Sequence, residues 1–190
     1  HEMYDVLAED LSCDYTVYLM DTRGHGASAT PKEFHYSQMA EDVLALCHAL
    51  SLSDTILVGY SDGAIMALMA VLKEESLFKK LVLCGANLSP AGLSHSLLHQ
   101  IKKEYKKTGD PLKNLMLQEP HIEPDSLPSI SIPVLVVAGE KDCIRKKETL
   151  SIARHIPRST LHIVQGEDHG SYLTHTAMAA SFLRPFFLEQ

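Results

Sequence analysis

The hydrophobic and polar positions of this chain alternate between short apolar runs and longer amphipathic stretches. Apolar runs bounded by turn residues predict strands, and apolar residues that repeat every three or four positions predict helices with one buried face. Because strands and helices follow one another in turn, the pattern favours an α/β fold with a mostly parallel sheet flanked by helices. The predicted strands are residues 15–20, 55–59, 80–84, 134–139 and 160–164, and the predicted helices are residues 36–50, 64–72, 93–107 and 172–183.

Two details of this pattern can be compared directly with a structure. The helix at 36–50 places Met39, Val43, Leu46 and Leu50 on one face, which we expect to be buried. Between Gly85 and Pro133 the regular alternation stops, and Ser, His, Lys and Pro become frequent. We interpret about residues 86–130 as a short helical cap inserted between two sheet strands of a single domain, residues 1–190.

Composition narrows the class of protein further. The chain has 190 residues, of which 45% are hydrophobic and 22% charged, as in a soluble globular domain. Its longest uncharged apolar stretch, residues 64–72, is far shorter than the roughly 20 residues of a membrane span, so we expect no membrane association. A net charge of −7 without a basic stripe argues against a nucleic-acid partner. Four scattered cysteines without a C-x-x-C pair favour reduced thiols and a cytoplasmic location.

The sharpest local motif is G-x-S-x-G, formed by Gly59, Tyr60, Ser61, Asp62 and Gly63 between a predicted strand and a predicted helix. A nucleophilic serine needs such a tight turn, because the turn exposes its hydroxyl and aims the next amide at the developing oxyanion. The sequence therefore indicates Ser61 as nucleophile and the Asp62 N–H as an oxyanion donor. The alternative is a glycine-rich turn with an incidental serine.

A serine hydroxyl is a weak nucleophile, so it requires a base and a group that orients the base. Asp142 follows the predicted strand at 134–139, and His169 follows the last predicted strand. Loops at the carboxyl ends of parallel strands meet at one edge of the sheet, so these side chains can converge on Ser61. Glu140 is the main rival of Asp142 for the acid, and we rank Asp168 lower. Taken alone, Asp142 also fits a helix cap and His169 an ordinary loop histidine.

Four segments together resemble the α/β-hydrolase superfamily: residues 59–63, 21–28, 133–142 and 166–170. The chain is most similar to small bacterial esterase-like members whose short cap carries an acidic and proline-containing stretch, as residues 119–124 do here. The resemblance implies Ser61 as nucleophile, Asp142 as acid and His169 as base. It also implies that Arg23 in the 21–28 loop is structural.

The beginning of the chain departs from this pattern. Members of the superfamily open with strands that precede the helix resembled by residues 3–11, and one of those strands ends in a His-Gly loop that supplies the second oxyanion donor. These N-terminal strands are absent from this chain, and one of them would lie between the strands at 15–20 and 55–59. An exposed sheet interior is costly, so we expect roughly 45 to 60 residues to precede His1 in the intact protein. Strand exchange within a homodimer is the alternative.

The function we predict is a serine hydrolase, of the carboxylesterase type, that cleaves a small ester or related acyl substrate through an acyl-enzyme. Two alternatives remain: a non-catalytic ligand-binding or truncated inactive protein of the same fold, and a C–C bond hydrolase. The predicted acyl pocket is formed by Leu88, Leu93, Leu97 and Met116 of the cap.

The sequence predicts no cofactor and no metal. His95 and His99 have a spacing that suits metal binding, but no third ligand accompanies them. Neither a G-x-G-x-x-G motif nor a phosphate-binding loop is present, so a nucleotide cofactor is not implied.

Overall fold

The computed structural model describes residues 2–189 and contains a four-stranded parallel sheet with the order β1-β2-β3-β4. The fold class predicted from the sequence, a mostly parallel sheet flanked by helices, is confirmed, and the predicted strands in this sheet are correct to within two residues. The strands are β1 (Thr55–Tyr60), β2 (Phe78–Cys84), β3 (Val134–Gly139) and β4 (Ser159–Val164).

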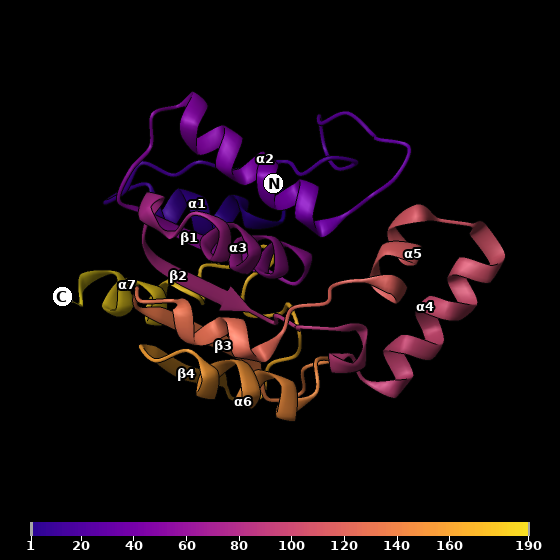
Figure 1. Cartoon of the computed structure of the whole chain (residues 1–190). Helices are drawn as coiled ribbons and strands as arrows, with labels where there is room; N and C mark the ends of the chain where they lie inside the picture. Colours follow the sequence, from indigo (N-terminus) through magenta and orange to yellow (C-terminus); the bar gives the residue numbers. More distant parts are fainter. Residues whose placement is uncertain (1, 190) are drawn as a thin grey trace.

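Helices cover both faces of the sheet (Figure 1). The helices are α1 (Asp5–Leu11), α2 (Tyr36–Ala49), α3 (Asp62–Lys73), α4 (His95–Thr108), α5 (Pro111–Gln118), α6 (Lys146–His155) and α7 (Ala180–Leu188). Because side chains alternate along a strand, Leu81 and Leu83 of β2 join the core beneath α2, α3 and α6, whereas Val82 and Cys84 join the core beneath α1 and α7. Short 3-10 helices span Glu2–Tyr4, Glu75–Leu77, Pro90–Gly92 and Pro124–Ser129.

The two central strands and the edge strand β1 differ in burial. Every residue of β3 is buried, which fits its unbroken apolar sequence. In β1 only Gly59 is buried, and Val58 remains 37% exposed. Within residues 2–189, β1 pairs with β2 and with no other strand. The predicted strand at 55–59 is therefore present, but the burial that its apolar residues led us to expect is wrong.

The predicted strand at 15–20 is also wrong, because residues 16–20 have no regular secondary structure. A strand requires a hydrogen-bonded neighbour, and in the described part of the chain this segment has none. Tyr18 and Leu19 are 53% and 41% exposed, while Tyr15 packs edge-on against Phe187 with ring centroids 5.4 Å apart. Some apolar residues of the segment 15–20 therefore face solvent, and others contact the core beside α7.

The predicted helices at 64–72 and 93–107 match α3 and α4 to within two residues at each end, whereas the helix at 36–50 differs in its buried face and the last helix in where it begins. Helix α2 ends one residue early, and its buried face is formed by Tyr36, Met39, Ala40, Leu44 and Cys47; Leu50 is exposed. The last helix begins at Ala180 and not at Tyr172.

The delayed start of the last helix has a local cause. His175 has a positive φ of 52°, and its amide donates to the Met3 carbonyl near the beginning of the chain. A positive φ interrupts a right-handed helix, so the segment that begins at Tyr172 turns before α7 can start.

The chain between β2 and β3 forms an arm that carries α4 and α5. Figure 1 shows these two helices together on the side toward which the arrow of β2 points, beyond the carboxyl ends of the strands. Gly109 ends α4 in the left-handed conformation, which allows the tight connection to α5. A small core of Leu93, Ile101 and Ile144 holds the arm to the sheet. This arm occupies most of the segment that we interpreted as a cap.

A buried lysine fixes the end of the last helix. Lys80 of β2 is 2% exposed, and its Nζ donates hydrogen bonds to the carbonyls of Phe186 and Phe187 at 2.6 and 3.0 Å, and to that of Glu189. Carbonyls at a helix end lack partners within the helix, so the ammonium group satisfies them. No helix within residues 2–189 has the length and apolar character needed to cross a bilayer.

Candidate active site

Ser61 lies in a sharp turn between β1 and α3. It has φ 52° and ψ −121°, a combination that non-glycine residues rarely adopt, and its amide donates to the Cys84 carbonyl at 2.8 Å. A Cβ atom at Gly59 would lie 2.3 Å from the Gly63 carbonyl oxygen, so this position requires glycine. At Gly63 an added Cβ meets nothing closer than 3.9 Å, so only the first glycine of the motif is sterically required.

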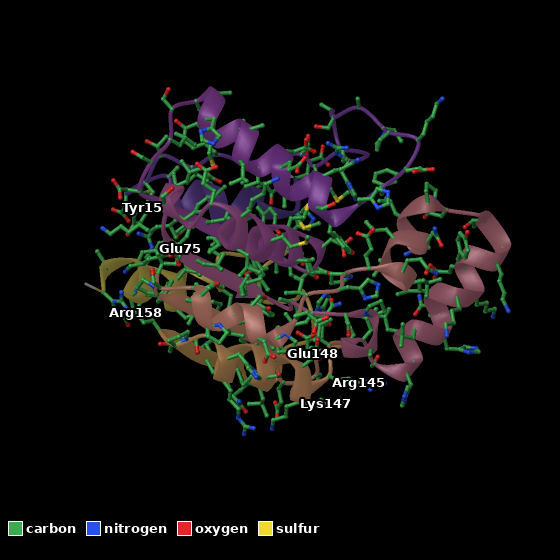
Figure 2. The ribbon with its side chains drawn as sticks, in the orientation of Figure 1. Tyr15, Glu75, Arg145, Lys147, Glu148 and Arg158 are labelled. Atoms are coloured by element: carbon green, nitrogen blue, oxygen red, sulfur yellow. The ribbon has the colours of Figure 1, made fainter. Side chains whose placement is uncertain are left out.

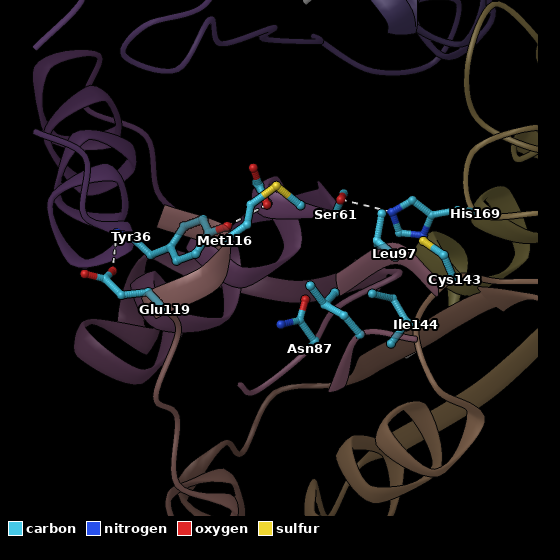
Figure 3. Close-up of a pocket in the computed structure, with 11 residues that line it drawn as sticks. Tyr36, Ser61, Asn87, Leu97, Met116, Glu119, Cys143, Ile144 and His169 are labelled. Carbon is cyan, nitrogen blue, oxygen red and sulfur yellow. Dashed lines mark hydrogen bonds between the residues drawn. The ribbon is translucent and has the colours of Figure 1, made fainter. Parts of the chain in front are cut away.

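Three predicted site residues lie in one hydrogen-bonded chain. His169 Nε2 is 3.0 Å from Ser61 Oγ, and His169 Nδ1 is 2.7 Å from Asp142 Oδ1 (Figure 3 shows the first contact). Ser61 follows β1, Asp142 follows β3, and His169 follows β4, so all three come from the carboxyl edge of the sheet. The amide of Asp62 is the first of α3 and has no acceptor within the helix, which leaves it available to a ligand.

Backbone amides hold the Asp142 carboxylate in place, and the carboxylate contacts the imidazole of His169. Asp142 Oδ1 also accepts from the Ile144 amide at 2.8 Å, and Oδ2 accepts from the Gly139 amide at 3.3 Å. The Asp142 side chain is 4% exposed and that of His169 is 21% exposed. Burial lowers the pKa of His169, but the interactions with Asp142 and Cys143 outweigh it and raise that pKa to about 10.

The rival carboxylates have other partners. Glu140 Oε2 accepts from the Gly166 amide at 2.8 Å and so links the loops after β3 and β4. Asp168 Oδ1 accepts from the amides of Gly170 and Ser171 at 3.0 and 2.9 Å, and these bonds lower its pKa. Asp142, and not either rival, is therefore the carboxylate that contacts the His169 ring.

A cavity of about 150 Å³ opens beside Ser61 and His169. Three of the four predicted pocket residues line it: Leu93, Leu97 and Met116. Leu88 does not, because it lies in a second cavity of about 250 Å³ with Ile122 and other residues. Its amide donates to Glu148 Oε1 of α6, a residue labelled in Figure 2, which holds this part of the chain against α6.

Part of the lining of the first cavity is polar and acidic. Tyr36 Oη donates to Asp62 Oδ1 at 2.6 Å, and the Tyr36 amide donates to Glu119 Oε2 at 3.0 Å (Figure 3). Burial raises the pKa of Asp62, and the hydrogen bond from Tyr36 only partly offsets this. Glu119 also binds His35 Nδ1 at 2.6 Å, which fastens the end of the arm to the start of α2.

Sequence reasoning missed several residues that line this cavity, namely Tyr36, Asn87, Glu119, Cys143 and Ile144. Cys143 and Ile144 directly follow Asp142, so their proximity to the site could have been inferred from the acid loop. Asn87 lies three residues after the end of β2, so the same strand-end argument could have indicated it. Tyr36 and Glu119 carry no such signal, because their approach depends on how α2 and the arm pack against the sheet.

The arm and the loop after β3 are joined by backbone contacts. Leu93 and Ile144 form an isolated antiparallel bridge, and the Ser94 amide donates to the Cys143 carbonyl at 2.8 Å. The Arg145 amide donates to the Gly92 carbonyl, also at 2.8 Å. The segment that starts the arm therefore braces the loop that holds Asp142.

Two other groups noted in the sequence lie away from this centre. Arg23 forms a bidentate contact with Asp42 of α2, with both N to O distances at 2.7 Å, and so supports the 21–28 loop. His95 and His99 are exposed on α4. Among the described residues they belong to no group of three metal-ligating side chains.

Comparison with known proteins agrees with this arrangement at the level of the fold. Serine hydrolase BPHL of Homo sapiens is 29% identical in an alignment 189 positions long, and the alignment covers 84% of this chain and 65% of the human protein. This chain thus spans just under two thirds of the length of that relative. A hydrolase structure from Oleispira antarctica superimposes with a TM-score of 0.83 at 19% identity, covering 99% of this chain and 86% of the other. A thermophilic esterase from Thermogutta terrifontis gives 0.77 at 21% identity, with 97% and 84% coverage.

The sequence also matches a family model directly. The model of the alpha/beta hydrolase fold matches residues 1–110, which include the turn at Ser61 and the beginning of the arm. With the parallel sheet, the strand-to-helix turn and the structural neighbours, this match shows that the chain belongs to the alpha/beta hydrolase fold family.

Proposed function

We propose that this chain carries the catalytic centre of a serine hydrolase that cleaves small carboxylic esters or related acyl substrates through an acyl-enzyme. The observation that carries the proposal is the hydrogen-bonded chain from Ser61 Oγ through the His169 ring to Asp142, at 3.0 and 2.7 Å. The name of the human relative, a serine hydrolase, supports the same class of activity.

In the first half of the reaction, Ser61 Oγ attacks the substrate carbonyl while Nε2 of the neutral His169 ring accepts its proton. Because the pKa of His169 is raised, the neutral form of the ring increases with pH. Asp142 keeps the proton on Nδ1, so Nε2 presents its lone pair to the hydroxyl. The negative charge that develops on the carbonyl oxygen receives a hydrogen bond from the Asp62 amide, reinforced by the positive end of α3. Protonated His169 then gives its proton to the leaving alcohol, and the acyl group remains on Ser61.

In the second half, water replaces the alcohol. His169 removes a proton from water, the resulting hydroxide attacks the acyl carbonyl, and the proton passes to Ser61 Oγ as the acid product leaves. Each group thereby returns to its initial protonation state.

The cavity favours a small and uncharged substrate. Its volume of about 150 Å³ is comparable with apolar cavities that hold a benzene-sized guest. Leu93, Leu97 and Met116 offer an apolar surface to an acyl chain, whereas the carboxyl group of Glu119 in the same cavity would repel an anionic substrate.

The test is covalent labelling with a fluorophosphonate probe together with hydrolysis of p-nitrophenyl acetate. We expect wild type to be labelled and to turn over, and Ser61→Ala to lose both. Ser53→Ala is the matched control, because Ser53 is exposed just before β1, at the opposite end of that strand.

Three results would contradict the proposal in different ways. Labelling that survives in Ser61→Ala rejects the nucleophile. A wild-type protein that is not labelled favours a ligand-binding protein of the same fold. Labelling without ester turnover, combined with cleavage of a C–C bond in a β-diketone, favours a C–C bond hydrolase.

A further inference from the structure

A thiol lies beside the candidate catalytic imidazole and has no role in the proposed reaction. Cys143 directly follows Asp142, and its sulfur lies next to the His169 ring in Figure 3. One ligand atom from each of Asp142, Cys143 and His169 can be chosen such that all three lie within 4.8 Å of one another. Among residues 2–189 this is the only group of three metal-ligating side chains with that proximity.

The three donors are those that a thiophilic divalent cation prefers. Thiolate sulfur, imidazole nitrogen and carboxylate oxygen are the usual zinc ligands, and typical zinc-to-ligand distances place neighbouring ligand atoms roughly 3.3 to 3.6 Å apart. Side chains whose ligand atoms lie within 4.8 Å therefore need to move by only about 1 Å to enclose such an ion.

The carboxylate has an oxygen available for the ion. Asp142 Oδ1 accepts two hydrogen bonds, from the Ile144 amide and from His169 Nδ1. Within the described residues, Oδ2 accepts a single longer bond, from the Gly139 amide at 3.3 Å. A carboxylate oxygen carries two lone pairs, so Oδ2 can bind a cation while Oδ1 keeps its contact with the Ile144 amide.

The group is also accessible and suitably charged. Cys143 and His169 both line the cavity of about 150 Å³, so an ion can approach from the side on which Ser61 lies. Three protein ligands leave the fourth tetrahedral position to water, as in zinc sites with an open coordination position. A thiolate and a carboxylate together balance the charge of a divalent cation.

We infer that Asp142, Cys143 and His169 form an inhibitory site for a thiophilic divalent cation, represented by Zn²⁺. The inhibitory effect rests on the proposed function, whereas the binding itself does not. On binding, the Cys143 thiol releases its proton to solvent, and the His169 ring releases any proton from the nitrogen that coordinates the ion. The sulfur and that nitrogen then bind the ion together with Asp142 Oδ2. Because the lone pair of this nitrogen is then bound to the cation, the neutral ring can no longer accept the proton of the Ser61 hydroxyl.

Binding can be measured without any assay of activity. Chelator-treated protein is titrated with Cd²⁺, and the ultraviolet charge-transfer band of a cadmium thiolate reports ligation by cysteine. We expect wild type to saturate at one ion per chain and Cys143→Ser to bind at least tenfold more weakly without the band. Cys13→Ser is the matched control, because Cys13 is an exposed free thiol outside the group.

Two outcomes of this titration overturn the inference: a band that persists in Cys143→Ser, or a band lost in Cys13→Ser. His169→Asn is the second variant, expected to keep the thiolate band but to bind at least tenfold more weakly. Unchanged affinity in that variant would show ligation by the thiol alone. Circular dichroism verifies folding of each variant, and Cys143→Ala replaces the serine variant if that one is unfolded.

The inhibitory effect is tested separately. Zn²⁺ should slow fluorophosphonate labelling of wild type and of Cys13→Ser, and Cys143→Ser should need at least tenfold more Zn²⁺ for the same effect. Equal inhibition of the three proteins at the same Zn²⁺ concentration would refute the proposal that the ion acts at this site. If wild type is not labelled even without metal, the proposed function fails, and the cadmium titration still decides whether the cation site exists.

Discussion

Gly85 supports the His169 ring, and replacing it with alanine tests whether the position of that ring controls activity. Gly85 follows β2 with φ +63°, and its amide is held by the Val137 carbonyl at 2.9 Å. A Cβ atom added there would lie 2.6 Å from His169 Cε1 and 2.8 Å from Nδ1. Ordinary carbon contacts begin near 3.5 Å, so the ring must retreat by about 0.9 Å.

A displacement of this size disturbs the contacts of the ring with Ser61 and Asp142. Misplacement of a reacting group by about 1 Å can reduce the rate by about 100-fold, so we expect kcat/KM of Gly85→Ala for p-nitrophenyl acetate to fall by about that factor. Fluorophosphonate labelling should slow in parallel, because it requires the same hydrogen bond at Ser61 Oγ.

Gly109→Ala provides a matched control for the backbone. Gly109 has φ +67°, but an added Cβ there meets no atom within 4 Å. Both variants place an alanine in the left-handed conformation, which should lower the free energy of unfolding by about 1 to 2 kcal/mol in thermal or urea denaturation. Only Gly85→Ala also contacts His169. The reasoning is refuted if Gly85→Ala retains the wild-type kcat/KM, or if Gly109→Ala loses as much activity as Gly85→Ala.

Three further variants test other parts of the structure. Lys80→Met removes the donor to the Phe186 carbonyl and its neighbours, so the free energy of unfolding measured in urea should fall by about 3 kcal/mol. A decrease below about 1 kcal/mol would contradict the role of Lys80. Glu119 raises the pKa of His35, so their pairing stabilises the fold below pH about 6.5 and this contribution is lost as pH rises through the raised pKa. The melting temperature of Glu119→Gln should therefore fall further below that of wild type at pH 5.5 than at pH 9, and a difference independent of pH would exclude this linkage. Leu97→Trp should fill the cavity and raise KM for p-nitrophenyl butyrate more than for the acetate without lowering the melting temperature; an equal effect on both esters would show that Leu97 does not contact the acyl chain.

The parts of the fold that could be predicted are those in which neighbouring residues determine the local structure. An unbroken apolar run gave the correct bounds of β3, because a strand buried on both faces tolerates few polar side chains. The turn at Ser61 was predictable because Gly59 allows the close approach of Gly63. The approach of Asp142 and His169 to Ser61 was inferred from their positions after two predicted parallel strands and from their order along the chain, and their roles in catalysis remain predictions.

The parts that could not be predicted depend on distant contacts. Residues 15–20 have the composition of a strand, but they lack a pairing partner within the described chain. The turn at His175 depends on its bond to the Met3 carbonyl, from the other end of the chain. Leu88 was assigned to the acyl pocket for its apolar character, yet the packing of the arm against α6 directs it to the second cavity.

The bridge between Leu93 and Ile144 has a consequence for protein engineering. The first residues of the arm and the residues just after Asp142 share one set of backbone hydrogen bonds. A chimera that carries the arm of another hydrolase would pair that arm with residues 143–145 of this chain and could lose these hydrogen bonds beside Asp142. Exchanging residues 143–145 together with the arm would preserve them, so the two segments should be transferred as one unit.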